Sequence, residues 1–264
     1  MSPDLIVVPL LPLESYEQRC KFEQWIKIVP VIAIGSGLGR DAKLLDRFEY
    51  ILENFKNKIV VGDGDFFWYL TKNLERFWKG LKNVRSLILT PNLGELKRLY
   101  KSITKKDLDY DAIKDTIIKI KSPYDIFEIE THKYVPELNE MFNYLEGGNC
   151  FFILKGSFDL ILSANKCFVV RNKASLKRSG GQGDVLTGLC SLYSLWATEK
   201  DIDIELGLVL ASYINRRASF AAFKRKKLGM VAEDMIDEVT EVINEFIEDT
   251  TVFNDDSSQE FTKV

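Results

Sequence analysis

Three glycines and an aspartate lie together in the segment SGGQGD at 179–184, directly before an apolar, helix-compatible run at 185–192. Glycines leave backbone N–H groups unobstructed, and a helix N-terminus offers unpaired N–H groups and the positive end of the helix dipole. Lys177 and Arg178 precede this segment, so it predicts a phosphate-binding site. A carboxylate beside an anion is electrostatically unfavourable, which indicates that Asp184 takes part in proton transfer rather than in a charge pair. The alternative is a loop with a structural role only.

A second glycine cluster, Gly35–Arg40, follows a predicted strand. It resembles a dinucleotide fingerprint only superficially, because Arg40 stands where the third glycine of GxGxxG would fall, and a Walker A sequence is absent from the chain. A tight turn from strand to helix explains the glycines equally well.

Two carboxylates, Asp63 and Asp65, follow the next predicted strand. Carboxylates two residues apart at a strand end could hold Mg²⁺ or bond to ligand hydroxyls. A turn with an aspartate as helix N-cap is the interpretation we favour for these two residues alone.

The segment Thr90–Leu96 begins with Thr-Pro, which ends a strand. Asn92 is a good N-cap, and Glu95 three residues later completes a capping box. Capping accounts for these residues, and it also puts Asn92 and Glu95 at the edge of the sheet where ligands bind.

Lys155 follows another predicted strand and precedes Gly156. A lysine in this position could contact a nucleotide phosphate. A hairpin turn with a solvated lysine explains the pattern equally well.

Short apolar stretches alternate with helix-compatible stretches along most of the chain. Strands are predicted at 4–11, 29–34, 58–61, 86–89 and 151–154, with a hairpin at 160–162 and 167–170. Helices are predicted at 15–27, 41–55, 184–198, 204–223 and 233–246. This alternation predicts an α/β fold with a mostly parallel central sheet flanked by helices on both faces. Ligands bind outside the carboxyl ends of such strands, where the segments above cluster.

Two stretches lack this pattern. Residues 101–140 are charged and poorly periodic, which predicts a surface insertion. Residues 249–264 are polar and acidic, which predicts a disordered tail after a single domain at 1–248.

The composition limits the function classes. The chain has 264 residues, 46% of them hydrophobic, with 36 basic and 39 acidic side chains and a net charge of −3. This near-balance argues against a nucleic-acid partner, and no apolar run reaches the length of a membrane span. Four scattered cysteines predict a reduced, cytoplasmic chain. Since His132 is the single histidine, a carboxylate is the expected general base.

These segments, in this order, resemble the ATP-dependent NAD(P)H-hydrate dehydratase family over residues 2–246. The GGQGD form is typical of that family, whereas related kinases more often carry GTGD. The matching segments are SPDLIV at 2–7, GSGLGR at 35–40 with Ser36 in place of a proline, VGDGD at 61–65, LTPN at 89–92, LKG and DLI within 154–161, KRSGGQGD at 177–184 with Ser179 in place of a cysteine, and AEDMI at 232–236.

The resemblance implies a ribokinase-like fold and a repair reaction on NADHX or NADPHX, with ATP as phosphoryl donor and Mg²⁺ as cofactor. ATP phosphorylates the hydroxyl of the damaged nicotinamide ring, and elimination of phosphate restores the cofactor. Phosphate is a far better leaving group than hydroxide, which gives the reaction its physical rationale.

The resemblance also implies residue roles. Asp184 would act as base, and the backbone of Gly181 and Gly183 would hold the phosphoryl group. The implied ATP contacts are Lys155, Gly156, Ser157, Phe158, Asp159, Ala174, Ser175, Leu176, Lys177, Arg178, Ser179, Gly180, Gly181, Gln182 and Gly183. The implied substrate contacts are Gly37, Asn92, Leu93, Gly94, Glu95, Leu96, Lys97, Arg98 and Asp184.

Members of the family usually carry further sequence before the strand that matches SPDLIV at 2–7, including a Gly-rich β–α unit that helps to line the substrate pocket. We therefore expect this domain to lack its usual first β–α unit, and either to compensate by association as a homo-oligomer or to have reduced activity.

Two other functions stay open. One is a small-molecule kinase of the ribokinase-like group, such as a vitamin-precursor kinase, which would release a stable phosphorylated product. The other is a shortened, non-catalytic relative that binds a nucleotide or a partner.

Overall fold

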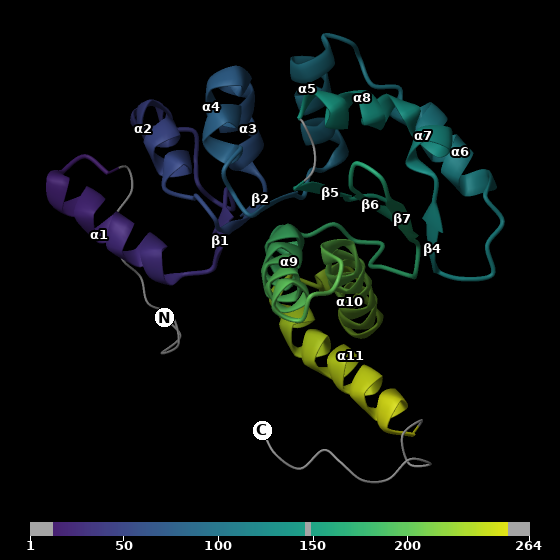
Figure 1. The fold of residues 1–264 in the computed structure, drawn as a ribbon. Coiled ribbons are helices and arrows are strands. Elements are labelled where there is room, and N and C mark those ends of the chain that lie inside the picture. The colour runs from purple at the N-terminus through teal and green to yellow at the C-terminus, as the bar shows by residue number, and fades with distance from the viewer. Residues whose placement is uncertain (1–12, 146–148, 253–264) are drawn as a thin grey trace.

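The structure is a computed structural model that describes residues 13–145 and 149–252. The strand predicted at 4–11 lies outside these residues. Within them, a seven-stranded sheet separates two layers of helices (Figure 1). The strands are β1 (Val31–Ile34), β2 (Ile59–Gly62), β3 (Ser86–Leu89), β4 (Ile126–Ile129), β5 (Cys150–Leu154), β6 (Asp159–Leu162) and β7 (Cys167–Val170). The helices are α1 (Tyr16–Ile28), α2 (Ala42–Glu53), α3 (Asp65–Lys72), α4 (Leu74–Leu81), α5 (Leu93–Thr104), α6 (Tyr110–Lys119), α7 (Thr131–Tyr134), α8 (Pro136–Tyr144), α9 (Gln182–Glu199), α10 (Ile204–Lys226), the 3₁₀ helix η1 (Lys227–Gly229) and α11 (Glu233–Val252).

The strand order is β1-β2-β3-β5-β6-β7-β4. The pairs β1–β2, β2–β3 and β3–β5 are parallel, whereas β5–β6, β6–β7 and β7–β4 are antiparallel. It follows that β1, β2, β3, β5 and β7 share one direction, and β6 and β4 run the other way. The predicted α/β class is confirmed, and the sheet is mixed because the predicted β6–β7 hairpin enters it.

The core has two parts, one on each face of the sheet. Leu87 and Leu89 of β3 face a cluster formed with helices α1 to α8, whereas Ile88 between them faces a cluster formed with α9, α10 and α11. All three side chains are buried. A strand that is buried on both faces consists of a continuous apolar run, which explains why such strands could be predicted from the sequence.

Local capping sets the starts of several helices. Ser15 and Gln18 form a capping box at α1, with both hydrogen bonds at 3.1 Å. Asn92 and Glu95 form the predicted capping box at α5. The helices predicted at 184–198, 204–223 and 233–246 correspond to α9, α10 and α11.

The prediction of a surface insertion at 101–140 is wrong. This stretch holds the end of α5, then α6, β4, α7 and α8, and it buries Ile113, Ile117 and Leu138 in the core. β4 completes the far edge of the sheet by pairing with β7. The charged side chains lie on the outer faces of these elements, which hid the apolar spacing.

The helices α3 and α4 were not predicted. They bury the aromatic side chains of Phe66, Tyr69 and Phe77, and Phe48 of α2 packs against all three rings, with centroid distances of 4.7–5.8 Å. Asn73 ends α3 and caps α4 through Arg76 N–H.

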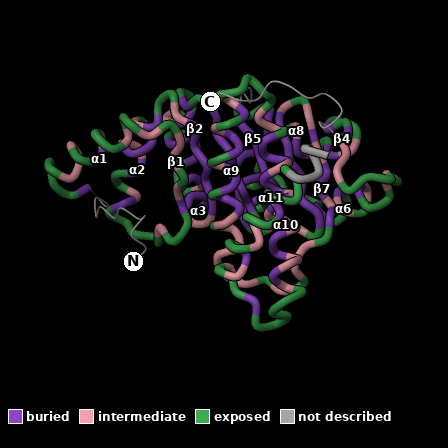
Figure 2. The backbone as a smooth tube through the Cα atoms, turned by 90° about the horizontal axis from the view of Figure 1, so that it is seen from below, coloured by how far each residue is buried: buried purple, intermediate pink, exposed green. Residues whose placement is uncertain are grey.

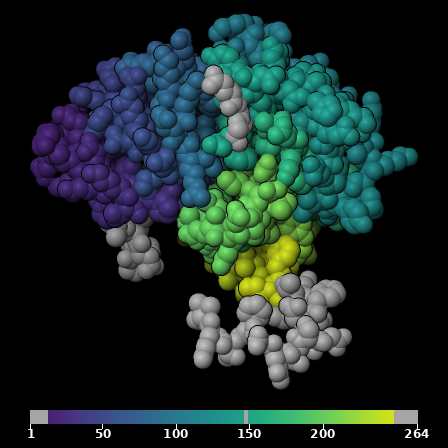
Figure 3. Space-filling model, viewed as in Figure 1, coloured from purple at the N-terminus to yellow at the C-terminus, as the bar shows by residue number. Residues whose placement is uncertain are grey.

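The burial pattern follows the layers. Figure 2 shows buried residues along the sheet and the inner faces of α9 and α10, and exposed residues around the rim. In Figure 3 the green and yellow C-terminal helices form a layer below the blue and teal part of the chain. α11 continues to Val252, so the predicted tail from 249 begins inside this helix. Among the described helices, none is both long and apolar enough to cross a membrane.

Candidate active site

The predicted site segments meet at the carboxyl ends of β1, β2, β3 and β5. Asp63, just after β2, donates its N–H to Ile34 O of β1 at 3.0 Å. Lys155, just after β5, donates its N–H to Pro91 O at 3.1 Å and forms a parallel bridge with Asn92 after β3. Parallel strands end at one edge, so the geometry follows from the topology.

A partly buried ion pair lies at the centre of this edge. Lys155 Nζ is 2.6 Å from Asp63 Oδ1, and the Thr90 hydroxyl donates to the same oxygen at 2.8 Å. The interpretation of Asp63 as a helix N-cap is wrong, since Gly64 caps α3 without a side-chain hydrogen bond. Lys155 is not a solvated turn lysine either, because its side chain is only 24% exposed.

The first turn of α9 lies against this ion pair. Gly181 is the N-cap and has φ +88°, a left-handed conformation that favours glycine. A Cβ atom at Gly183 would lie 3.2 Å from Asp63 Oδ2 and 3.4 Å from Lys155 Nζ. The N-terminal amides of α9 and the Lys155 ammonium therefore converge, which is an arrangement suited to a phosphate group.

Asp184 lies on the same first turn and is exposed to solvent. Its Oδ2 is 3.9 Å from the Cβ position of Gly181. The carboxylate therefore flanks the start of α9 and is accessible to a ligand held there.

The glycine loop after β1 packs beside Asp65. Gly39 N–H donates to Asp65 Oδ2 and Arg40 Nε to Asp65 Oδ1, both at 3.0 Å. Gly35, Gly37 and Gly39 all have positive φ, which fits the alternative of a tight turn from strand to helix. A Cβ at Gly37 would meet nothing within 4 Å, which leaves the backbone there open to a ligand.

The segment Asn92–Arg98 forms the start of α5 and contains both buried and exposed side chains. Asn92 N–H donates to Glu95 Oε2 at 2.8 Å, and Glu95 N–H donates to Asn92 Oδ1 at 3.0 Å. Burial raises the pKa of Glu95, an effect that the Asn92 N–H and the Lys155 charge oppose. Leu96 is fully buried in the core, whereas Lys97 and Arg98 are exposed.

The segment Lys155–Asp159 forms the turn between β5 and β6. Phe158 and Asp159 are buried, and Ser157 is exposed. Gly156 N–H donates to Asp159 Oδ1 at 3.0 Å, which closes the turn. Burial raises the pKa of Asp159, and the Arg216 guanidinium and the Gly156 N–H act in the opposite direction.

The segment 174–183 runs from β7 to α9 and is anchored from two sides. Lys177 Nζ donates to Met230 O at 2.8 Å, and Ser175 Oγ accepts from Lys177 N–H at 3.0 Å. Gln182 Nε2 donates to Lys177 O at 3.0 Å and to Ser179 Oγ at 2.9 Å. Leu176, by contrast, is 86% exposed.

A preformed protein cage for a metal ion is not part of this site. Among residues 13–145 and 149–252, no group of three or more His, Cys, Asp and Glu side chains could hold a metal ion. Mg²⁺ is usually bound by one or two carboxylates together with substrate phosphates, which the Asp63 carboxylate beside the start of α9 fits.

The sequence suggested Asp63 as a ligand of Mg²⁺ or of hydroxyls, but a turn was favoured there, and Thr90 and Arg216 were not among the predicted site residues. Asp63 carried a signal, because a carboxylate ends a strand next to the predicted ligand edge. Thr90 was noted only for ending its strand. Arg216 carried a weaker signal, an arginine on the buried face of α10.

Comparison with known proteins identifies the family. A family profile described as NAD(P)H-hydrate dehydratase matches residues 1–241. The chain belongs to this family. Proteins named ATP-dependent (S)-NAD(P)H-hydrate dehydratase are similar to it over 90–94% of its length. Those from Mus musculus, Homo sapiens and Drosophila pseudoobscura pseudoobscura are 28%, 27% and 26% identical. The chain covers 64%, 65% and 72% of their respective lengths.

Solved structures support the fold of this NAD(P)H-hydrate dehydratase family member. A hypothetical protein from Streptococcus mutans matches with TM-score 0.64 at 16% identity, over 86% of this chain and 70% of that one. A ribokinase-like superfamily protein from Enterococcus faecalis matches with TM-score 0.60 at 18% identity, over 86% and 68%. These likenesses establish a ribokinase-like α/β fold.

Proposed function

We propose that this chain restores NADH and NADPH from their hydrated forms, NADHX and NADPHX, in an ATP-dependent dehydration. One observation carries the proposal: the amide end of α9 lies against the Lys155–Asp63 pair and is flanked by the exposed carboxylate of Asp184. A phosphate-binding helix end with an accessible base beside it is what phosphoryl transfer to a hydroxyl requires. The family membership supports the choice of substrate.

In this proposal the start of α9 holds the phosphoryl group that is transferred. The backbone N–H groups of Gln182 and Gly183 begin the helix, and the dipole of α9 adds to their attraction for an anion. Lys155 supplies a positive charge at the same point. Such fixed donors stabilise developing charge by several kcal/mol in comparable sites.

Asp184 accepts the proton of the ring hydroxyl as that oxygen attacks the terminal phosphorus. The new O–P bond forms while the bond to the leaving nucleoside diphosphate breaks. Elimination then breaks the C–O bond of the ring, the electron pair leaves with phosphate, and a proton is lost from the adjacent ring carbon. Asp184 serves this chemistry because its carboxylate is exposed to the ligand side.

The hydrated dinucleotide would lie across the ends of β1 and β3, against Gly37 and the segment Asn92–Arg98. Leu96 is buried, so it supports this wall from behind through packing. Phe158 supports the nucleotide side in the same way. Mg²⁺ would neutralise phosphate charge here, and Asp63 Oδ2, which lies beside the start of α9, is the carboxylate oxygen that would hold it.

The test is incubation with NADHX and ATP while the absorbance of NADH at 340 nm is followed. The parent protein regains absorbance, and Asp184→Asn lowers the rate by about 10²- to 10⁴-fold, the usual contribution of a positioned base. Asp237→Asn, which neutralises an exposed aspartate on α11, keeps the parent rate. Equal rates in Asp184→Asn and the parent would contradict the assigned role.

The kinase alternative gives a different product. A small-molecule kinase would accumulate a stable phosphorylated compound, whereas the dehydratase releases inorganic phosphate in step with NADH. Phosphorus NMR of the reaction mixture distinguishes the two.

A further inference from the structure

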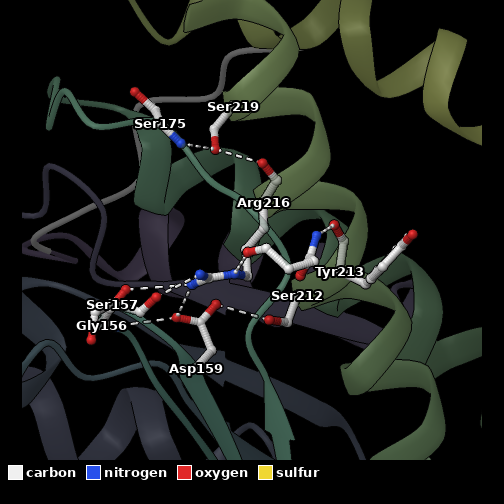
Figure 4. A network of polar contacts seen from close by, with 9 residues as sticks. Gly156, Ser157, Asp159, Ser175, Ser212, Tyr213, Arg216 and Ser219 are labelled. Carbon is white, nitrogen blue, oxygen red and sulfur yellow. Dashed lines mark hydrogen bonds and ion pairs between the residues drawn. The ribbon is translucent and has the colours of Figure 1, made fainter. Parts of the chain in front are cut away.

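One face of α10 carries polar side chains into the interior. Ser212, Arg216 and Ser219 lie four and three residues apart, so they share a face of the helix, and all three are buried. Arg216 is only 4% exposed. The charge and the N–H donors of a buried arginine need partners, and Figure 4 shows the polar contacts around Arg216.

The Arg216 guanidinium binds two segments that are distant in the sequence. On the turn after β5, Nη2 donates to Ser157 O at 2.7 Å and Nη1 lies 3.2 Å from Asp159 Oδ1. After β7, Nε donates to Asn172 O at 2.9 Å. Nη1 also reaches Gly156 O at 3.4 Å.

Ser212 and Ser219, on the same face of α10, each hydrogen-bond to one of these two segments. Ser212 Oγ donates to Asp159 Oδ2 at 2.8 Å, which fixes the turn after β5. Ser219 Oγ accepts from Ser175 N–H at 3.1 Å and donates to Arg216 O at 2.8 Å, which fixes the segment after β7. One helix face therefore anchors both segments.

We propose that Arg216 is a positioning residue that locks the segments 156–159 and 172–175 to each other as one rigid unit for nucleotide binding. Residues 156–159 and 174–175 are among the ATP contacts that the family resemblance implies, so the nucleotide part of this inference rests on the proposed function. A planar guanidinium donates in several fixed directions at once, which a single ammonium on a flexible stem does not. Because these contacts hold the two segments in place before the nucleotide binds, less conformational entropy is lost on binding.

The test compares Arg216→Lys with Arg217→Lys. The two substitutions are chemically identical and adjacent on α10, but Arg217 hydrogen-bonds to Tyr213 OH and forms an ion pair with Glu245. ATP affinity is measured by calorimetry, amide exchange by mass spectrometry, and KM separately for ATP and for NADHX. Ser219→Ala is a second variant that leaves every charge in place, so the test does not depend on how well Arg216→Lys folds.

In Arg216→Lys, the amides of 156–158 and 173–175 exchange faster together, and ATP affinity falls by about tenfold or more, the loss expected for bonds to a charged group. KM for ATP rises while KM for NADHX stays within about twofold. Ser219→Ala shows the same direction with a smaller effect, centred on the amide of Ser175. Arg217→Lys matches the parent.

Three results would overturn the lock: faster exchange in one segment only, parental exchange in both, or lowered thermal stability with unchanged ATP affinity. If the parent protein itself binds no ATP, the proposed function fails instead. Joint release of both segments in the exchange experiment then still supports the lock.

Discussion

The substitution Gly183→Ala probes the helix end at which phosphate is proposed to bind. The added methyl would lie 3.2 Å from Asp63 Oδ2 and 3.4 Å from Lys155 Nζ, and both are side-chain atoms that need to yield only by a few tenths of an ångström. φ at Gly183 is not positive, so alanine fits the backbone. The crowding is offset by the higher helix propensity of alanine, about 0.5–1 kcal/mol. We expect the free energy of unfolding to stay within about 1 kcal/mol of the parent value.

Activity is expected to respond very differently from stability. The methyl fills the space between the start of α9 and the Lys155 ammonium, where the phosphoryl oxygens are proposed to lie. Loss of one such donor in comparable sites costs about 10²- to 10³-fold in kcat, or about 2.7–4 kcal/mol. The assay is recovery of NADH from NADHX and ATP, measured beside thermal unfolding of the same sample.

Gly188→Ala is the matched control, because Gly188 lies in the same helix and a Cβ there meets nothing within 4 Å. This variant keeps parental activity and gains about 0.5–1 kcal/mol of stability. A folded Gly183→Ala protein with activity within about threefold of the parent would refute the phosphate-site reasoning, since that loss is far below the one derived from donor removal.

Three further substitutions test the fold and the electrostatics around the site. Lys227 has φ +52° and ψ −131°, a conformation that costs a side chain about 1–3 kcal/mol, so Lys227→Gly raises the melting temperature by about 2–4 °C for each kcal/mol gained; a lowered melting temperature would contradict this. Gly35→Ala destabilises the protein by more than about 3 kcal/mol in denaturant unfolding, because its Cβ would lie 1.8 Å from Asp63 O at φ +116°. Burial raises the folded-state pKa of Glu95, so the folded chain binds that proton more tightly and stability falls as pH rises from about 4.3 through the raised pKa. Glutamine does not titrate, so the stability of Glu95→Gln relative to the parent rises across that pH window, as measured by the melting temperatures of both proteins at several pH values. A difference in melting temperature that stays constant with pH would contradict the raised pKa.

The parts of the fold that were predictable from the sequence are those with one dominant signal. The strands at 59–62, 86–89 and 150–154 are buried on both faces, so their residues form continuous apolar runs. The starts of α5 and α9 carry a capping box and a glycine segment, which are local signals that need no knowledge of the rest of the chain.

The wrong predictions concern elements whose role depends on distant partners. β4 is a short edge strand with Glu128 exposed in its middle, and only its pairing with β7 makes it a strand. Asp63 was taken for a cap because its partners, Thr90 and Lys155, are 27 and 92 residues away. Contacts at such separations follow from topology, which local spacing does not reveal.

The central claim is that one chain couples phosphate release to restoration of the nicotinamide ring. The most direct measurement follows NADH absorbance, ADP and inorganic phosphate in the same reaction of the parent protein with NADHX and ATP. The account predicts one ADP and one phosphate for each NADH formed. ADP formation without NADH, or NADH formation at an equal rate without ATP, would contradict it.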